Sequence, residues 1–333
     1  MLDTRAAAHA VSEQAELLIG RRKSSRQSTN RLYRRQPVRA GSQLGWGLSM
    51  NSDIAYALAA MVCYGAGDFI YKRAAATGVA AEQFLMGQGW VFCPAAIGYA
   101  WITGTLDVTP YAGLGGLAGL FLLVGFFNYV GSLGSGSVSV IAPVFRLNFI
   151  VTAALAIGWL GEPLTGAKLI GFATALAAGW LLLGGSVQGR ATEQASTPRA
   201  LMQVTVATLS TGVANFCHKL GLAGGATPET MLAAQAIVFS TLMSGVSYAR
   251  NGTIRLPQAV AMHSAAASVL IAAFLFLLHG MRHGQASVVV PITQMGFGIA
   301  TVLGIIFFDE ALTARKIAGL GAAGVALLLF AVR

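Results

Sequence analysis

The sequence predicts an all-α membrane protein with ten transmembrane helices, arranged as two inverted five-helix repeats. Three observations lead to this fold class: the composition, the length of the apolar blocks and an internal repeat. Hydrophobic residues make up 55% of the 333 positions and charged residues 10%, whereas soluble domains carry about 25% charged residues. A water-soluble fold has no room for so much apolar surface, so we expect lipid to surround most of the chain.

The apolar blocks have the length of membrane-spanning helices. An α-helix needs about 18 to 25 apolar residues to cross the hydrocarbon core of a bilayer, whereas strands of a membrane barrel alternate over about ten residues. The blocks are continuous, so they predict helices. The ten predicted spans lie near residues 53–74, 82–103, 111–131, 137–160, 166–186, 201–222, 229–249, 259–281, 285–308 and 314–332.

The polar segments divide the chain into four regions. Residues 1–50 form a basic tail, 51–187 the first repeat, 188–200 a linker and 201–333 the second repeat. The tail holds nine of the 22 Lys and Arg residues, and its polarity predicts disorder. An alternative is that synthesis starts at Met50 and the tail is not made. Because the net charge of +10 is concentrated in this tail, it does not predict nucleic-acid binding.

The two halves align with each other. At an offset of 147 residues, the matching positions are Gly65, Phe69, Lys72, Glu82, Gln88 and Phe92 with Gly212, Phe216, Lys219, Glu229, Gln235 and Phe239. At an offset of 148, they are Ser139, Pro143, Phe149, Glu162, Leu164, Thr165, Lys168 and Gly171 with Ser287, Pro291, Phe297, Glu310, Leu312, Thr313, Lys316 and Gly319. Five spans per repeat is an odd number, so we expect the second repeat to be inserted upside down relative to the first.

Two of the aligned segments resemble a known family. The sequences "GEPLTGAKLIG" and "DEALTARKIAG" each close one span and open the next, and they resemble the hallmark between the fourth and fifth helices of the EamA family in the drug/metabolite transporter superfamily. The resemblance implies a ten-helix transporter of amino acids, sugars, other metabolites or drugs, located in the inner membrane with both termini in the cytoplasm. It does not specify the solute.

The distribution of positive charge only partly agrees with that orientation. With the termini inside, the outer connections hold Lys72, Arg73, Arg190, Arg199, Arg250, Arg255, Arg315 and Lys316, and the inner ones hold Lys168, Lys219, Arg282 and Arg333. The positive-inside rule therefore favours the opposite orientation for the body of the chain, and the family's orientation when the tail is counted.

Two prolines at matched positions predict interrupted helices. Pro143 and Pro291 lie within the fourth and ninth spans, where a proline leaves the carbonyl four residues earlier without its usual partner. Those carbonyls belong to Ser139 and Ser287. Interrupted helices at equivalent points of two repeats indicate a transport site; the alternative is a plain kink, repaired by a serine hydroxyl or by water.

Ionisable residues within the spans are the other candidates for a solute site. Tyr64, Asp68 and Lys72 lie on one face of the first span. Asp68 and Lys72 form a structural pair unless a solute or a proton competes for Asp68. In the second repeat, Asn215 replaces Asp68 and Lys219 replaces Lys72. Each lysine either lines the cavity or extends to the lipid headgroups.

Arg146 adds a positive charge just beyond the first proline. Together with Lys72 and Lys219 it favours an anionic or zwitterionic solute such as an amino acid or organic acid. A permanent ion pair with Asp68 is the structural alternative. Gln294 is a candidate polar residue of the same cavity. A lipophilic cation is the alternative solute, if the three cations face lipid and Asp68 stands alone.

The expected function is secondary active transport of a small organic metabolite by alternating access, with proton coupling or exchange. We expect lipid and a small solute as partners, a monomer or homodimer, no nucleic acid, no cofactor and no metal. The three cysteines are isolated in apolar segments, no phosphate-binding loop is present, and the histidines and acids lack the spacing of an enzyme site. The alternatives are a multidrug exporter and a membrane scaffold without transport activity.

Overall fold

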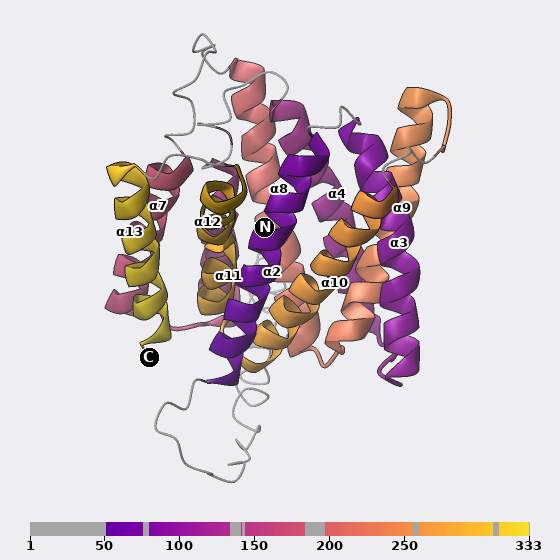
Figure 1. Cartoon of the computed structure of the whole chain (residues 1–333). Helices are drawn as coiled ribbons and strands as arrows, with labels where there is room; N and C mark the ends of the chain where they lie inside the picture. The colour runs from indigo at the N-terminus through magenta and orange to yellow at the C-terminus, as the bar shows by residue number, and fades with distance from the viewer. Residues whose placement is uncertain are drawn as a thin grey trace, which may run out of the picture. The chain divides into compact units, whose positions relative to one another are not determined.

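The computed structural model describes residues 51–75, 80–133, 141, 144–183, 197–255, 260–308 and 313–332. The elements are α2 (Ser52–Ala75), α3 (Ala81–Ile102), the short 3-10 helix η1 (Pro110–Ala112), α4 (Gly113–Leu133), α6 (Asn148–Leu160), α7 (Gly166–Leu183), α8 (Pro198–Ala223), α9 (Pro228–Asn251), α10 (Val260–His283), α11 (Ala286–Gln294), α12 (Gly296–Phe308) and α13 (Ala314–Ala331). These helices run alongside one another in one compact unit, Met50–Arg333 (Figure 1). The predicted tail, 1–50, and linker residues 188–196 lie outside the described residues.

The all-helical fold class is confirmed for the described residues, which contain no strand. Each predicted span coincides with helix; the ninth is divided into α11 and α12, and the fourth is described from residue 144 onward. Seven segments are long and apolar enough to cross a membrane: Ser52–Tyr71, Pro110–Tyr129, Pro198–Ala223, Pro228–Asn251, Met262–His283, Ala286–Phe307 and Ala314–Ala331. Two further apolar helices, Val144–Leu160 and Gly166–Leu182, are shorter. The chain is therefore a multi-pass membrane protein.

The outer surface of the bundle is apolar. Large hydrophobic side chains such as Trp159 and Leu328 are 76% and 70% exposed, which would be unfavourable in water over so wide an area. Inside the bundle, small residues such as Ala57, Ala214 and Ala273 are fully buried. This distribution fits a protein whose outside faces lipid and whose helices approach each other through small side chains.

Helices of the first half pack mainly against helices of the second half. Helix α2 contacts α10, α11 and α12, whereas α8 contacts α4 and α6. In addition, α3 packs against α9, and α7 packs against α13. The core is thus largely an interface between the two halves of the sequence.

Glycines on α4 allow one of these helix contacts to be very close. A Cβ atom added at Gly115 would lie 2.5 Å from the carbonyl oxygen of Met231, and one at Gly119 would lie 2.6 Å from that of Gln235. Both carbonyls belong to the backbone of α9 and cannot move aside. Gly115 and Gly119 therefore form a close-packing face of α4.

One end of the bundle is described almost completely. We call it the proximal end and define it by Asp53, Thr105, Glu162, Thr227 and Gly284. Contacts across it join connections far apart in the sequence: the Thr227 hydroxyl donates to the Thr105 carbonyl at 2.8 Å, and the Asp53 side chain packs against Gly284.

At this end, Thr227 caps α9, so a modest and local loss of stability is expected for Thr227→Val. The side chain accepts a hydrogen bond from the Thr230 N–H at 3.2 Å, and its removal should lower the free energy of unfolding by about 1 kcal/mol. Unfolding of the detergent-solubilised protein measures this. Thr205→Val is the control, because Thr205 is exposed and its hydroxyl bonds only within its own helix, to Leu201. Equal effects of the two substitutions would contradict the capping role.

Candidate functional site

Two helix interruptions lie at matched positions of the two halves. The Leu147 N–H donates to the Val144 carbonyl at 3.0 Å, one residue before α6 begins, and the Met295 N–H donates to the Ile292 carbonyl at 3.0 Å, between α11 and α12. Leu147 and Met295 are separated by the repeat offset of 148 residues. Such tight turns within a transmembrane segment are typical of functional hinges.

The interruption in the ninth span does not occur at its proline. Pro291 lies inside α11, and the helix continues to Gln294. Ser287, whose carbonyl was expected to be freed, lies in the first turn of α11. The counterparts Ser139 and Pro143 lie outside the described residues.

Arg146, one residue before the first interruption, joins the two halves. One terminal nitrogen of its guanidinium forms an ion pair with the Asp68 carboxylate on α2, and the other donates to the Gln294 Oε1 at 3.2 Å. Gln294 is the sequence counterpart of Arg146 at the offset of 148 residues. The Arg146 and Asp68 side chains are 19% and 35% exposed, so the pair lies in a partly open space rather than in packed core.

The Arg146 guanidinium carries more donors than its two described acceptors use. A guanidinium has five N–H donors, and two acceptors from the described residues are bound to it. Tyr64 lies one turn before Asp68 on α2. Its ring and that of Phe274 form a T-shaped pair with 5.7 Å between the ring centroids. The Tyr129 ring stacks on Phe145, the residue before Arg146 in the sequence, with 4.1 Å between the ring centroids. Aromatic side chains therefore lie beside both members of the ion pair in the sequence.

An apolar pocket adjoins the guanidinium. Its volume is about 180 Å³, and its lining residues are Val144, Arg146, Leu147, Phe149, Ala175, Leu176, Gly179, Trp180 and Phe297. Arg146 is the charged residue among them. The pocket is therefore apolar apart from this one arginine.

Other residues predicted for the site lie elsewhere. Asn215 is buried on α8, which packs against α6. Lys219 lies at the proximal end, where its ammonium donates to the carbonyls of Met281 and Gly284 at 2.7 and 2.6 Å. It therefore neither faces Arg146 nor extends to the headgroups. Lys72 belongs to α2, and its side chain lies outside the described residues.

A buried polar group at the proximal end was not predicted as a unit. It comprises Glu162, Lys168, Gln285 and Ser287, whose side chains and backbone bond across the two halves. The repeat could have pointed to this group, because Glu162, Lys168 and Ser287 each have an identical counterpart in the other half of the sequence.

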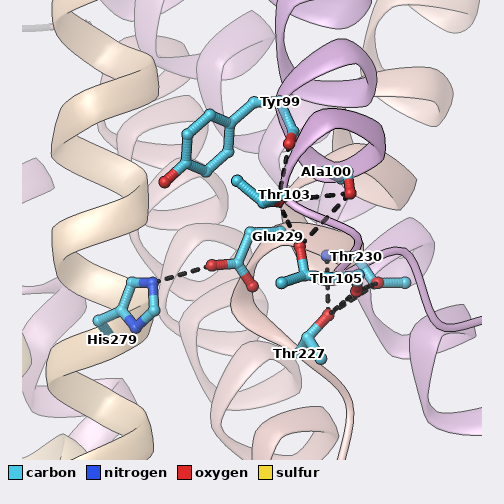
Figure 2. Close-up of polar contacts among 8 residues, drawn as sticks. All are labelled: Tyr99, Ala100, Thr103, Thr105, Thr227, Glu229, Thr230 and His279. Carbon is cyan, nitrogen blue, oxygen red and sulfur yellow. Dashed lines mark hydrogen bonds and ion pairs between the residues drawn. The ribbon is translucent and has the colours of Figure 1, made fainter.

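Figure 2 shows a second set of polar contacts at the same end, which joins α9, α10 and the connection after α3. The His279 ring lies 3.0 Å from the Glu229 carboxylate, and the Thr230 hydroxyl accepts from the Asp107 N–H at 2.9 Å. Thr227 caps α9, and Glu229 lies in the first turn of that helix, where its carboxylate binds His279. The described residues contain no cluster of three or more His, Cys, Asp or Glu suited to a metal ion.

The fold and these contacts define a multi-pass helical membrane protein in which Arg146, paired with Asp68 of the first half, also bonds to Gln294 of the second half. Residues 51–184 match the EamA-like transporter family, so the resemblance found in the sequence is confirmed for this segment, and members of that family are transporters. One solved crystal structure of a protein superposes with a TM-score of 0.70 and 15% sequence identity, over 84% of this chain and 96% of the other. At this identity the likeness shows the fold alone. No curated protein matches the chain significantly.

Proposed function

We propose that this protein is a secondary active transporter of the inner membrane that carries a small organic anion or zwitterion by alternating access. The observation that carries the proposal is the position of Arg146, which bonds to Asp68 and to its own sequence counterpart Gln294. A contact between counterparts is expected where the axis relating two inverted repeats passes through a protein. Solute sites of such transporters lie there, at interrupted helices.

The packing of the helices supports the inverted repeat. The repeat matches α2 with α8, α10 with α4, and α12 with α6. The contact of α2 with α10 therefore corresponds to that of α8 with α4, and the contact of α2 with α12 corresponds to that of α8 with α6. All four contacts are found. The self-paired contacts, α3 with α9 and α7 with α13, are also found. Because each half has an odd number of spans, the second half would cross the membrane in the opposite orientation to the first.

The ion pair suggests how binding is coupled to protons. A solute carboxylate that takes the Arg146 guanidinium displaces Asp68, and an unpaired carboxylate within the membrane is costly unless it takes up a proton. One anion and one proton then move together, and the site carries the same net charge before and after binding.

A thermal-shift screen of the detergent-purified protein tests the solute class. The probes are alanine, glutamate, succinate and 3-methyl-2-oxobutanoate, with ethidium as the cation, and we expect stabilisation by one or more of the first four. Uptake of a stabilising probe into proteoliposomes should depend on the pH gradient, and Asp68→Asn should remove that dependence. Stabilisation by ethidium alone would favour a lipophilic-cation exporter, and a wider panel without stabilisation or flux would favour a membrane scaffold.

A further inference from the structure

The connection after α6 caps a helix of the other half. Helix α6 ends at Leu160 and is followed by Gly161, whose φ of 71° lets the chain change direction at little cost. Glu162 comes next. The Glu162 carboxylate is buried and accepts hydrogen bonds from the Ala286 and Ser287 N–H groups at 2.8 and 2.9 Å. These are the first two amides of α11, where a negative charge is favoured by the helix dipole.

Lys168 completes this contact from the first turn of α7. Its ammonium, also buried, donates to the Pro163 carbonyl at 2.6 Å, the Gln285 Oε1 at 2.6 Å and the Ser287 hydroxyl at 2.8 Å. Three acceptors satisfy the three N–H bonds of an ammonium group. Glu162 and Lys168, both buried, therefore hold residues 285–287 at the start of α11 through four charge-assisted hydrogen bonds. The fifth, to the Pro163 carbonyl, stays within the connection after α6.

The same short helix also reaches the proposed solute site. Helix α11 has nine residues, which correspond to about 13 Å. Its first turn is bound by Glu162, and its last residue, Gln294, is bound by Arg146. A shift of Gln294 when solute occupies Arg146 is therefore transmitted along one rigid element to the contacts of Glu162.

We propose that Glu162 and Lys168 form a latch with the start of α11, which holds the proximal end of the transporter closed and releases when that end opens. The proposal rests on the alternating-access function proposed above. Lys219 on α8 and Asp53 on α2 both contact Gly284, in the turn just before α11. Release of the latch therefore frees a junction at which four parts of the chain meet. The second contact set, between Thr230 and Asp107, closes the proximal end next to it.

The sequence repeat gives both residues of the latch, and Ser287, an identical counterpart in the other half. Glu162, Lys168 and Ser287 recur as Glu310, Lys316 and Ser139; Glu310 and Ser139 lie outside the described residues. In an inverted repeat these counterparts belong to the other membrane face. Glu310 is therefore the matched control for Glu162, because it is the same residue type at the equivalent position of the other half.

Hydrogen–deuterium exchange, measured on the full-length protein and on single-residue variants of it, tests the latch. In Glu162→Gln, the amides of Ala286 and Ser287 should exchange about tenfold or more faster, because a charged acceptor has been replaced by a neutral one. The decisive sensor is the Asp107 amide, which donates to Thr230 and does not touch Glu162. It should also exchange faster, because opening of the proximal end separates both contact sets.

Glu310→Gln should leave Ala286, Ser287 and Asp107 as protected as in the wild type, or more so. Faster exchange confined to Ala286 and Ser287 would mean that Glu162 is only a helix cap, and the latch would be refuted while the flux assay still tests the transport function. Where Glu162→Gln fails to fold, Ser287→Ala removes one acceptor of Lys168 and is read at the same Asp107 amide.

Discussion

Arg146→Gln is expected to reduce uptake of the transported solute about a hundredfold, because the loss of a charge-assisted contact in a partly buried site costs several kcal/mol. Arg146→Lys should restore only part of the uptake, since an ammonium cannot present the planar donors that bond Asp68 and Gln294 at once. Flux into proteoliposomes at saturating and low solute concentrations measures the change. Near-normal uptake by Arg146→Gln would exclude the proposed site.

Arg250→Gln is the control for general charge effects. Arg250 lies over the Phe127 ring at 4.5 Å, and its side chain is 54% exposed, so its replacement should change uptake by less than about twofold. The double variant Asp68→Asn/Arg146→Gln separates transport from folding. It should recover the stability that Arg146→Gln loses, because no carboxylate is left unpaired, but it should not recover uptake.

A large loss of stability is expected for alanine at Gly65 or Gly212, the matched glycines that contact the interrupted spans. The added Cβ would lie 2.7 Å from the carbonyl oxygen of Gly296 in one case and 2.8 Å from that of Asn148 in the other. Because neither carbonyl can move without shifting its helix, each substitution should lower the free energy of unfolding by about 2 kcal/mol or more.

Gly67→Ala, on the same helix as Gly65, is the matched control. The nearest atom to its added Cβ would be the Leu270 Cδ2 at 3.4 Å, which is an ordinary contact. Alanine is favoured over glycine in helices by about 1 kcal/mol, so this variant should be as stable as the wild type or more stable. Unfolding in detergent measures all three variants, and a similar loss in all three would contradict the steric explanation.

Most of the fold followed from the sequence because the membrane imposes one simple rule on it. Apolar length alone located the spans: α9 and α10, for example, extend over Pro228–Asn251 and Val260–His283 where 229–249 and 259–281 were predicted. The division of the ninth span was expected from Pro291, yet the turn occurs at Met295. Loss of a single backbone hydrogen bond does not end a helix that is buried on all sides.

The site was predictable residue by residue but not as an arrangement. Arg146, Asp68 and Gln294 each appeared as costly polar groups within apolar spans, and an ion pair of the first two was among the alternatives. The position of Lys219 could not be obtained in this way. Its acceptors, the carbonyls of Met281 and Gly284, become available only where α10 ends, a feature of tertiary structure that helix periodicity does not encode.

The proposed pairing of the two halves has an electrostatic consequence at Arg146. If the two-fold axis of an inverted repeat passes here, an arginine in both halves would bring two guanidinium groups together, and like charges at that distance repel strongly in a medium of low polarity. Gln294, the neutral residue at the matched position, avoids this repulsion and accepts a hydrogen bond from Arg146 instead. The junction therefore depends on a difference between the halves as much as on their similarity.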